Sequence, residues 1–311
     1  MEKFLIFIIN PKAGNDKGER VWKKVKKELM KRDIMYRSFF TQRPGHAKDL
    51  AQQMCHMHHE NMKGIVSVGG DGTIHEVING MGQYMNIPVG FISAGSGNDF
   101  ARGFNLSRSP LHALNYILSS KFERSRSYDL GEFRLSARKH KPNYFSSSIG
   151  IGFDGEVAKQ TNESKYKGLL NKVGLGSLSY IFTLLNLSFK YKPFTLQIRV
   201  DNKRYVFDDV WLIATTNIKY YGGGMKICPE ARPNDGQFDI CVVHNLSRKK
   251  LFFLFGTVFL GLHTKMKEVT LLKGRDIEVI PDKPVTMHAD GEVIGTSPIS
   301  IKVLPKQIKV I

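Results

Sequence analysis

Residues 65–76 read Ile65-Val66-Ser67-Val68-Gly69-Gly70-Asp71-Gly72-Thr73-Ile74-His75-Glu76. The apolar run before Gly69 predicts a buried strand, and residues 73–81 predict a helix. Glycines between a strand and a helix let backbone amides surround an anion, because no side chain blocks the approach and the first helical turn has unpaired N–H groups. A tight turn without a ligand explains this one loop almost equally well.

Two further polar or glycine-rich loops follow predicted strands. The loop at 10–14 follows a strand at 4–9, and the loop at 94–99 follows a strand at 88–92. Ligands bind open parallel sheets at the carboxyl ends of their strands. We therefore expect the three loops to adjoin, so that one nucleotide can touch all of them.

The pattern of predicted elements divides the chain into two parts. The first third alternates strands and helices, with further helices at 16–31 and 45–58 and a strand at 38–41, which predicts an open, mostly parallel sheet. From about Asp129 the pattern becomes rich in strands and predicts an antiparallel second domain. Its expected strands are 144–149, 194–200, 206–215, 238–243, 276–287 and 300–304, with helices at 169–187 and 249–263.

Composition restricts the class of protein. A length of 311 residues favours two domains, and 41% hydrophobic with 24% charged residues is typical of a globular, soluble chain. The net charge is +18, from 46 Lys and Arg against 28 Asp and Glu. Such a surface attracts nucleic acid, anionic lipid or phosphorylated substrates. The three cysteines lack the spacing of a zinc site or a disulfide framework, which fits a reducing cytoplasm.

The glycine loops match neither common nucleotide-binding motif, because no Gly-Lys-Ser/Thr follows the first strand and no Gly-x-Gly-x-x-Gly opens the first helix. Residues 69–73, followed by Glu-Val-Ile-Asn-Gly at 76–80 and Gly-Asn-Asp-Phe-Ala-Arg at 97–102, instead resemble the signature of the diacylglycerol kinase catalytic-domain family. This family includes bacterial lipid kinases, sphingosine kinases and ceramide kinases. The resemblance continues in order at Asn10-Pro11 with Gly14, Thr41 with 45–47, 129–131, 150–154, 234–236 and 290–292.

The family resemblance implies a fold and a division of the chain. Residues 1–128 are expected to form a three-layer α/β nucleotide-binding domain similar to NAD kinase and phosphofructokinase, with 303–311 as a candidate completion. Residues 129–302 are expected to form a lipid-substrate domain rich in β-sandwich structure. The active site is expected in a cleft between the two domains.

The resemblance also implies which residues hold ATP and its Mg²⁺. Asp71 is the pivotal acid, and Asp99 and Asp129 would join it in a nucleotide magnesium network, although a helix cap or turn is the simpler interpretation of those two. His75 stands where the family more often has asparagine. An imidazole can replace only some of the hydrogen bonds that the asparagine amide forms. The implied nucleotide-binding residues are Asn10, Pro11, Lys12, Ala13, Gly14, Thr41, Gly69, Gly70, Asp71, Gly72, Thr73, Ile74, His75, Gly95 and Ser96.

Two Asp-Gly sequences in the second domain carry further implied roles. Asp290-Gly291 is typical of a hairpin turn, and the resemblance makes Glu292 the general base that accepts the proton of the lipid hydroxyl. Near Asp235, the resemblance implies a structural Mg²⁺ bound by that carboxylate and by the carbonyls of Arg232 and Gln237. A plain turn explains Asp235-Gly236 nearly as well.

The predicted helix at 16–31 carries Lys17, Arg20, Lys24 and further lysines opposite an apolar stripe. A solvated helix face is the usual interpretation, but each cation near an anionic membrane contributes roughly 1 kcal/mol. We expect a cytoplasmic protein that docks on the inner face of the membrane. No nucleic-acid partner is expected, because no recognised motif accompanies the charge. The apolar segments 178–187 and 251–262 could support a homodimer, although both are more often core.

These patterns together predict an ATP-dependent lipid kinase, with conversion of diacylglycerol to phosphatidic acid as the first choice. A sphingoid base, a ceramide or another lipid alcohol remains open as the acceptor. A kinase of a soluble substrate such as NAD and a catalytically silent nucleotide-binding regulatory protein are the rival interpretations.

Overall fold

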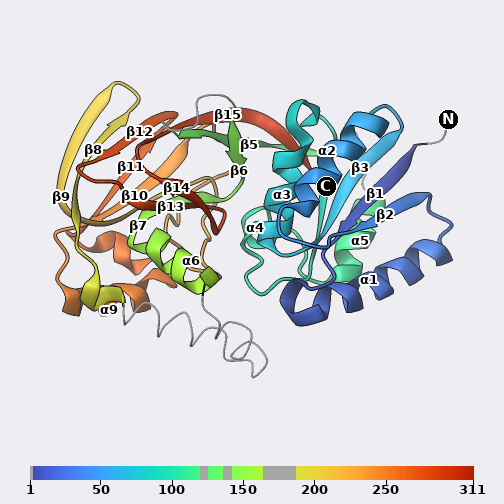
Figure 1. Cartoon of the computed structure of the whole chain (residues 1–311), viewed down its shortest axis with the longest axis horizontal. Helices are drawn as coiled ribbons and strands as arrows, with labels where there is room; N and C mark the ends of the chain where they lie inside the picture. Colours follow the sequence, from blue (N-terminus) through green and yellow to red (C-terminus); the bar gives the residue numbers. More distant parts are fainter. Residues whose placement is uncertain (1–2, 120–124, 136–141, 164–186) are drawn as a thin grey trace. The chain divides into compact units, whose positions relative to one another are not determined.

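A computed structural model represents the whole chain and describes residues 3–119, 125–135, 142–163 and 187–311. The chain divides into two compact units (Figure 1). Strands β5 (Arg126–Leu135) and β15 (Ile299–Val310) supply residues to both units. Unit 1 consists of Met1–Leu130, Pro233–Asp235 and Leu304–Ile311, and unit 2 consists of Gly131–Arg232 and Gly236–Val303.

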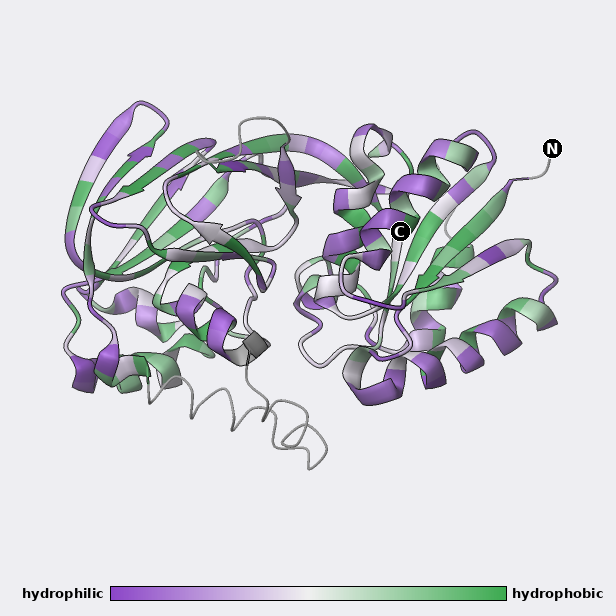
Figure 2. Ribbon diagram, in the orientation of Figure 1, coloured by the Kyte–Doolittle hydropathy of each residue, from purple (hydrophilic) through white to green (hydrophobic). Residues whose placement is uncertain are grey.

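A parallel sheet forms the centre of unit 1. Its strand β1 (Phe4–Ile9) is buried at every residue, as expected for a strand covered on both faces. Figure 2 shows this strand and its neighbour β3 largely in the hydrophobic colour. The strand order is β15, β4 (Val89–Ser93), β3 (Met62–Gly69), β1 and β2 (Tyr36–Phe40), and the pairs β1–β2, β1–β3, β3–β4 and β4–β15 are parallel.

Helices cover both faces of this sheet, which confirms the three-layer α/β prediction. Helices α1 (Ala13–Lys31) and α5 (Pro110–Ser119) lie on one face, and α2 (His46–His58) and α3 (Asp71–Met81) lie on the other (Figure 1). The apolar stripe predicted for the first of these helices is buried against the sheet, and its cations are exposed. Trp22 belongs to the same buried face and packs on the ring of Phe7.

Unit 2 is built from antiparallel strands, as expected for a β-sandwich domain. One hydrophobic core lies among the strands, and a second lies between the sheet and the helices α6 (Phe153–Glu163) and α9 (Arg248–Val258). Near the end of β9 (Lys203–Thr216), successive side chains alternate between the two cores, with Ile213 in the first core and its neighbours Leu212 and Ala214 in the second. The other strands are β6 (Asn143–Phe145), β7 (Ser148–Gly152), β8 (Phe194–Val200), β9 (Lys203–Thr216), β10 (Phe238–His244), β11 (Val269–Gly274), β12 (Asp276–Pro281), β13 (Thr286–Ala289) and β14 (Glu292–Thr296).

Several element boundaries differ from the sequence prediction. The strand predicted at 144–149 is two strands, β6 and β7, and the strand predicted at 276–287 is divided into β12 and β13. The helix predicted at 249–263 ends at Val258 and is followed by a short 3-10 helix, η3 (Leu262–Lys265), because Gly261 takes the left-handed conformation with φ 75°. The helix predicted at 169–187 and the apolar segment 178–187 lie almost entirely outside the described residues.

The cysteines have the structural role that their spacing suggests. Cys55, Cys228 and Cys241 are buried and unpaired with one another, and burial raises the pKa of the Cys55 and Cys228 thiols to about 12. These thiols are therefore protonated and unreactive at neutral pH. Among the described helices, none is both long and apolar enough to cross a membrane.

Candidate active site

The three predicted loops meet at one edge of the unit 1 sheet. Ile9 pairs with Val68 and Gly69 pairs with Ser93, so the strands β1, β3 and β4 end side by side. The side-chain amide of Asn10 donates a hydrogen bond of 3.2 Å to Oγ1 of Thr73 and so joins the first loop to the second. The prediction that these loops adjoin is confirmed.

The second and third loops touch through their backbones. The amides of Ala94 and Gly95 both donate to the carbonyl of Gly69, at 2.7 and 3.1 Å. A Cβ atom on Gly95 would lie 2.5 Å from Cα of Gly70, which is closer than real Cβ contacts allow. Glycine is thus required at Gly95, and the two loops present backbone rather than side chains at this edge.

Gly95→Ala is expected to lower the free energy of unfolding by about 2 kcal/mol, because backbone rather than a flexible side chain lies in the way of the new methyl group. The displaced loops should also bind nucleotide about tenfold more weakly, which corresponds to the loss of one hydrogen bond. Thermal unfolding and titration with a fluorescent ATP analogue measure the two effects. Gly256→Ala in α9 is the matched control, since a Cβ at that position would have no atom within 4 Å. It should leave nucleotide binding unchanged.

The loop after β1 has an unusual backbone. Gly14, Asn15 and Asp16 have φ values of 58°, 57° and 60°, so three successive residues are left-handed and the regular part of α1 begins after them. Such strain costs about 1–2 kcal/mol per non-glycine residue and often marks a binding loop. Gly18 allows the helix to approach this loop, because a Cβ there would lie 1.9 Å from the carbonyl oxygen of Asn10.

Asp71 is the first residue of α3, and its carboxylate is fixed by the third loop. The amide of Phe100 donates to Oδ1 of Asp71 at 3.0 Å. Phe100 belongs to the short helix α4 (Asp99–Gly103), which follows the left-handed residue Asn98. Helix α3 begins at Asp71, two residues earlier than predicted. Asp71 therefore lies at the amino-terminal end of the helix, where the helix dipole favours negative charge.

Glu76 connects α3 to the start of α2. Its two carboxylate oxygens accept the amides of Gly45 at 2.8 Å and Ala47 at 3.0 Å, so Glu76 caps the amino terminus of a neighbouring helix. The close packing of these helices needs Gly80, where a Cβ would lie 2.3 Å from the carbonyl oxygen of Lys48. The glutamate and glycine of the 76–80 motif therefore have structural roles that the motif alone did not reveal.

The remaining predicted nucleotide residues differ in accessibility. The side chain of Ile74 is buried, so only its backbone could meet a ligand, whereas Ser96 and Lys12 are exposed. Thr41 follows β2 and donates its amide to the carbonyl of Ile9. His75 lies one helical turn from Asn79, which donates its side-chain amide to the carbonyl of His75 at 3.0 Å.

The three predicted magnesium-directed acids have different surroundings. Asp71 is partly exposed, whereas Asp99 and Asp129 are buried. Arg102 donates to Asp99 at 2.7 Å, and the amide of Lys306 donates to Asp129 at 2.8 Å. Asp71 is therefore the most accessible of the three carboxylates to a ligand. Their membership in the magnesium network stays a prediction.

No group of three or more His, Cys, Asp or Glu side chains in the described parts of the chain could hold a metal ion. An ion beside Asp71 would therefore take its other ligands from nucleotide phosphates and water, as Mg²⁺ usually does. The structural Mg²⁺ predicted at Asp235, Arg232 and Gln237 would use one carboxylate and two carbonyls. This ligand set also stays a prediction.

In unit 2, Asp290 organises the hairpin that carries Glu292. Asp290 and Gly291 have φ values of 50° and 88°, as the predicted two-residue turn between β13 and β14 requires. The Asp290 carboxylate accepts the amides of Ser146, Ser147 and Ser148 at 2.9, 2.8 and 3.0 Å. This ring of donors fixes the turn and explains why the strand predicted at 144–149 is interrupted.

A buried polar cluster joins His288 of this hairpin to Asp154 of α6 and to Tyr221. Nε2 of His288 is 3.3 Å from Oδ2 of Asp154, and the hydroxyl of Tyr221 donates to the same oxygen at 3.3 Å. The amide of Gly291 donates to Nδ1 of His288 at 3.3 Å, which links the cluster to the turn. Glu292 follows this turn and is exposed.

Comparison with known proteins identifies the family. A family model described as "Diacylglycerol kinase catalytic domain" matches residues 4–132, and one described as "YegS C-terminal NAD kinase beta sandwich-like domain" matches residues 147–311. The protein "Putative lipid kinase YtlR" of Bacillus subtilis (strain 168) is 38% identical over 304 residues, which cover 98% of each chain. The chain belongs to the diacylglycerol kinase catalytic-domain family. It is therefore a member of a lipid kinase family.

A more distant relative and several solved structures are also similar to this chain. The "Diacylglycerol kinase" of Mycobacterium tuberculosis (strain ATCC 25618 / H37Rv) is 28% identical over 249 residues, covering 79% of this chain and 76% of that one. A crystal structure of a diacylglycerol kinase from Bacillus anthracis str. Sterne has a TM-score of 0.75 at 21% identity and covers 99% of this chain and 96% of that one. Yeast NADH kinase complexed with NADH has a TM-score of 0.52 at 10% identity, covering 100% and 83%. At these identities the structural likeness shows the fold alone.

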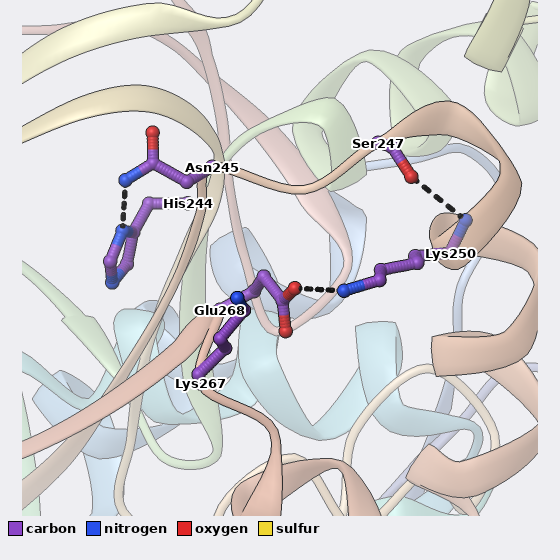
Figure 3. A pocket seen from close by; sticks show the side chains of 6 residues that line it. All are labelled: His244, Asn245, Ser247, Lys250, Lys267 and Glu268. Carbon is purple, nitrogen blue, oxygen red and sulfur yellow. Dashed lines mark hydrogen bonds and ion pairs between the residues drawn. The ribbon is translucent and has the colours of Figure 1, made fainter.

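A pocket of about 440 Å³ in unit 2 contains none of the residues that the family resemblance singled out. His244, Asn245, Ser247, Lys250, Lys267 and Glu268 line it (Figure 3). Lys250 reaches across to Glu268, and this hydrogen bond lowers the pKa of the glutamate carboxyl. Since this ion pair neutralises one of its two lysines, the pocket is a weaker candidate for nucleotide phosphates than the glycine loops of unit 1.

Proposed function

We propose that this protein transfers the γ-phosphoryl group of ATP to the hydroxyl of a lipid. Among candidate lipids, we propose diacylglycerol as the acceptor, which would give phosphatidic acid as the product. The observation that carries the proposal is the edge of the unit 1 sheet, where Asn10, Gly70 and Gly95 bring three loops together with backbone groups at the surface. The names of the relatives support a lipid as the acceptor.

Phosphoryl transfer depends mainly on positioning and on neutralising charge, which the described residues of unit 1 can support. The glycine loops can donate backbone amides to phosphate oxygens, as helix amino termini commonly do. When bound, Mg²⁺ would neutralise charge on the terminal phosphates, and Asp71 is the carboxylate proposed to hold it. The amide of Phe100 keeps this carboxylate in one orientation.

In unit 2, Glu292 is proposed to accept the proton of the attacking lipid hydroxyl. A carboxylate can act as such a base when it comes within hydrogen-bond reach of the hydroxyl in the substrate complex. The Asp290 turn holds the backbone before Glu292 through the amides of Ser146, Ser147 and Ser148. The side chain of Glu292 is exposed, so it can meet a substrate without rearrangement of a buried region.

Docking on an anionic membrane is proposed for the exposed cations of α1, including Lys17, Arg20 and Lys24. They lie opposite the buried stripe of that helix, and the chain as a whole carries a net charge of +18. Lys23 contributes less because it pairs with Glu19 at 2.8 Å. Each unpaired cation near an anionic leaflet is worth roughly 1 kcal/mol.

Incubation of the purified protein with radiolabelled ATP and a panel of acceptors tests the proposal. The panel contains diacylglycerol, a sphingoid base and a ceramide in mixed micelles, and NAD without lipid. Labelled phosphatidic acid is the expected product. Label on NAD alone would favour a soluble acceptor, whereas nucleotide binding without any labelled product would favour a silent nucleotide-binding protein. Either result would overturn the proposed function.

A further inference from the structure

The helix α9 and the turn after it are apolar on both of their faces. The inward face consists of Leu251, Leu254 and Val258, which belong to the second core of unit 2. Phe252 and Phe253 lie between them on the helix and are exposed on the opposite side. A helix that is hydrophobic all round normally lies inside a protein or against a membrane, so the outward face requires an explanation.

The outward residues are strongly exposed. Phe253 is 67% exposed and Leu260 is 70% exposed, and a Cβ added to Gly256 on the same side would have no atom within 4 Å. Single exposed apolar residues are ordinary, but a contiguous group marks an interaction surface. We define the α9 surface as Phe189, Phe252, Phe253, Phe259, Leu260 and Leu262.

Phe189 extends the α9 surface from a neighbouring segment. Its ring lies 6.4 Å from that of Phe252, and it is 68% exposed. Arg248 holds the two segments together, since its guanidinium donates to the carbonyls of Ser188 at 3.2 Å and Tyr191 at 3.3 Å. The surface is therefore built from two segments with a defined contact between them.

The charged residues in the stretch of chain that forms most of the α9 surface have one sign. Residues 245–267 contain no Asp or Glu. Lys250 is already paired with Glu268, as Figure 3 shows, which leaves positive charge in excess around the surface. The exposed cations of this stretch are Arg248, Lys249, Lys250, Lys265 and Lys267.

We propose that the α9 surface docks on an anionic lipid bilayer, with its aromatic and leucine side chains entering the boundary between headgroups and acyl chains. Exposed Phe and Leu flanked by Lys and Arg are the combination that binds reversibly at such an interface. Charge complementarity favours a bilayer over a second copy of this chain, because a two-fold contact through the same patch would bring its cations together. The inference rests on the proposed function only in one respect: docking would give the enzyme access to a lipid acceptor.

Vesicle binding of the full chain without ATP tests the proposal. Co-sedimentation is measured with phosphatidylcholine vesicles with and without phosphatidylglycerol, for the wild type, for Phe253→Ser/Leu260→Ser, and for Val206→Ser. Val206 is the matched control, since it is 65% exposed on β9 and lies outside the α9 surface. The double variant should bind anionic vesicles at least about tenfold more weakly, because two interfacial anchors are lost. The control should bind as the wild type does.

Several outcomes would overturn the α9 proposal. The first is that the wild type does not bind anionic vesicles. The second is that the double variant binds them as well as the wild type does. The third is that the double variant changes from dimer to monomer in sedimentation but still binds vesicles. Thermal unfolding of each variant separates loss of binding from loss of fold. Lys17→Ser/Lys24→Ser in α1 is measured in parallel and reports on the other proposed face.

Failure of the proposed function would give a different pattern of results. A water-soluble short-chain diacylglycerol tests transfer without a bilayer, and the double variant should phosphorylate it at the wild-type rate. If no variant transfers phosphate to any lipid but vesicle binding still depends on Phe253 and Leu260, the α9 proposal stands and the kinase proposal does not.

Discussion

Asp71→Asn is expected to lower the rate of phosphoryl transfer by roughly two to three powers of ten, the range found when one group that stabilises transition-state charge is removed. Asparagine has the same shape and keeps an oxygen for the amide of Phe100, which donates to Asp71 at 3.0 Å. The substitution thus removes the negative charge with little change in the loop. Steady-state kinetics with ATP and diacylglycerol measure the effect, and thermal unfolding tests whether the fold is retained.

Asp49→Asn provides the matched control for this prediction. Asp49 lies in the first turn of α2, as Asp71 lies in the first turn of α3, but its carboxylate forms an exposed pair with Arg43. Exposed pairs of this kind contribute at most about 1 kcal/mol to stability, so the control should keep its activity. Wild-type kinetics in Asp71→Asn would remove this carboxylate from the proposed mechanism and leave the nucleotide to be bound by backbone amides and cations alone.

The unit 1 sheet could be predicted from the sequence because the decisive information is local. Apolar runs such as Phe4–Ile9 end in polar or glycine-rich loops, and parallel strands place those ends at one edge. The meeting of Asn10 with Thr73 follows from this topology although the two residues are 63 positions apart in the chain. The family resemblance also singled out Gly95, but only the structure shows why glycine is needed there, which is the close approach to Gly70.

The boundaries in unit 2 could not be predicted because distant residues determine them. Ser146 and Ser147 interrupt a run of strand-forming residues only because their amides bind the carboxylate of Asp290, more than 140 positions later. No local property of the segment at 144–149 shows this. The pairing of Asp154 with His288 has the same origin, since its two members come from distant parts of the chain and meet only in the folded unit.

A residue of a family motif can have a structural role that the motif does not reveal. Glu76 stands in the family signature and could be taken for a binding residue, yet its carboxylate caps the start of α2 through the amides of Gly45 and Ala47. A carboxylate four or five positions after a glycine loop gives no indication of a partner in the preceding helix. The presence of an acid in a family motif does not say whether the fold or the reaction needs it, and the structure is required to tell the two roles apart.

Glu292→Gln is expected to lower the rate of transfer to diacylglycerol by about two to four powers of ten, which is the usual contribution of a general base. Glutamine has nearly the same size but cannot accept the proton of the lipid hydroxyl. Because Glu292 is exposed on β14, the free energy of unfolding should change by less than about 0.5 kcal/mol. Nucleotide affinity should also stay the same, so the loss should fall on kcat rather than on binding of ATP.

Glu278→Gln tests whether any glutamate of unit 2 has this effect. Glu278 lies on β12 and pairs with Arg199 at the surface, so its substitution removes the same charge without touching the proposed base. Asp290→Asn supplies the opposite contrast, because it weakens the ring of amides that fixes the turn and should lower stability together with activity. If Glu292→Gln loses activity but keeps its stability, whereas Asp290→Asn loses both, then Glu292 has a catalytic role and Asp290 a structural one in the same hairpin. Undiminished turnover in Glu292→Gln would instead assign the proton to solvent or to phosphate and leave Glu292 without a catalytic role.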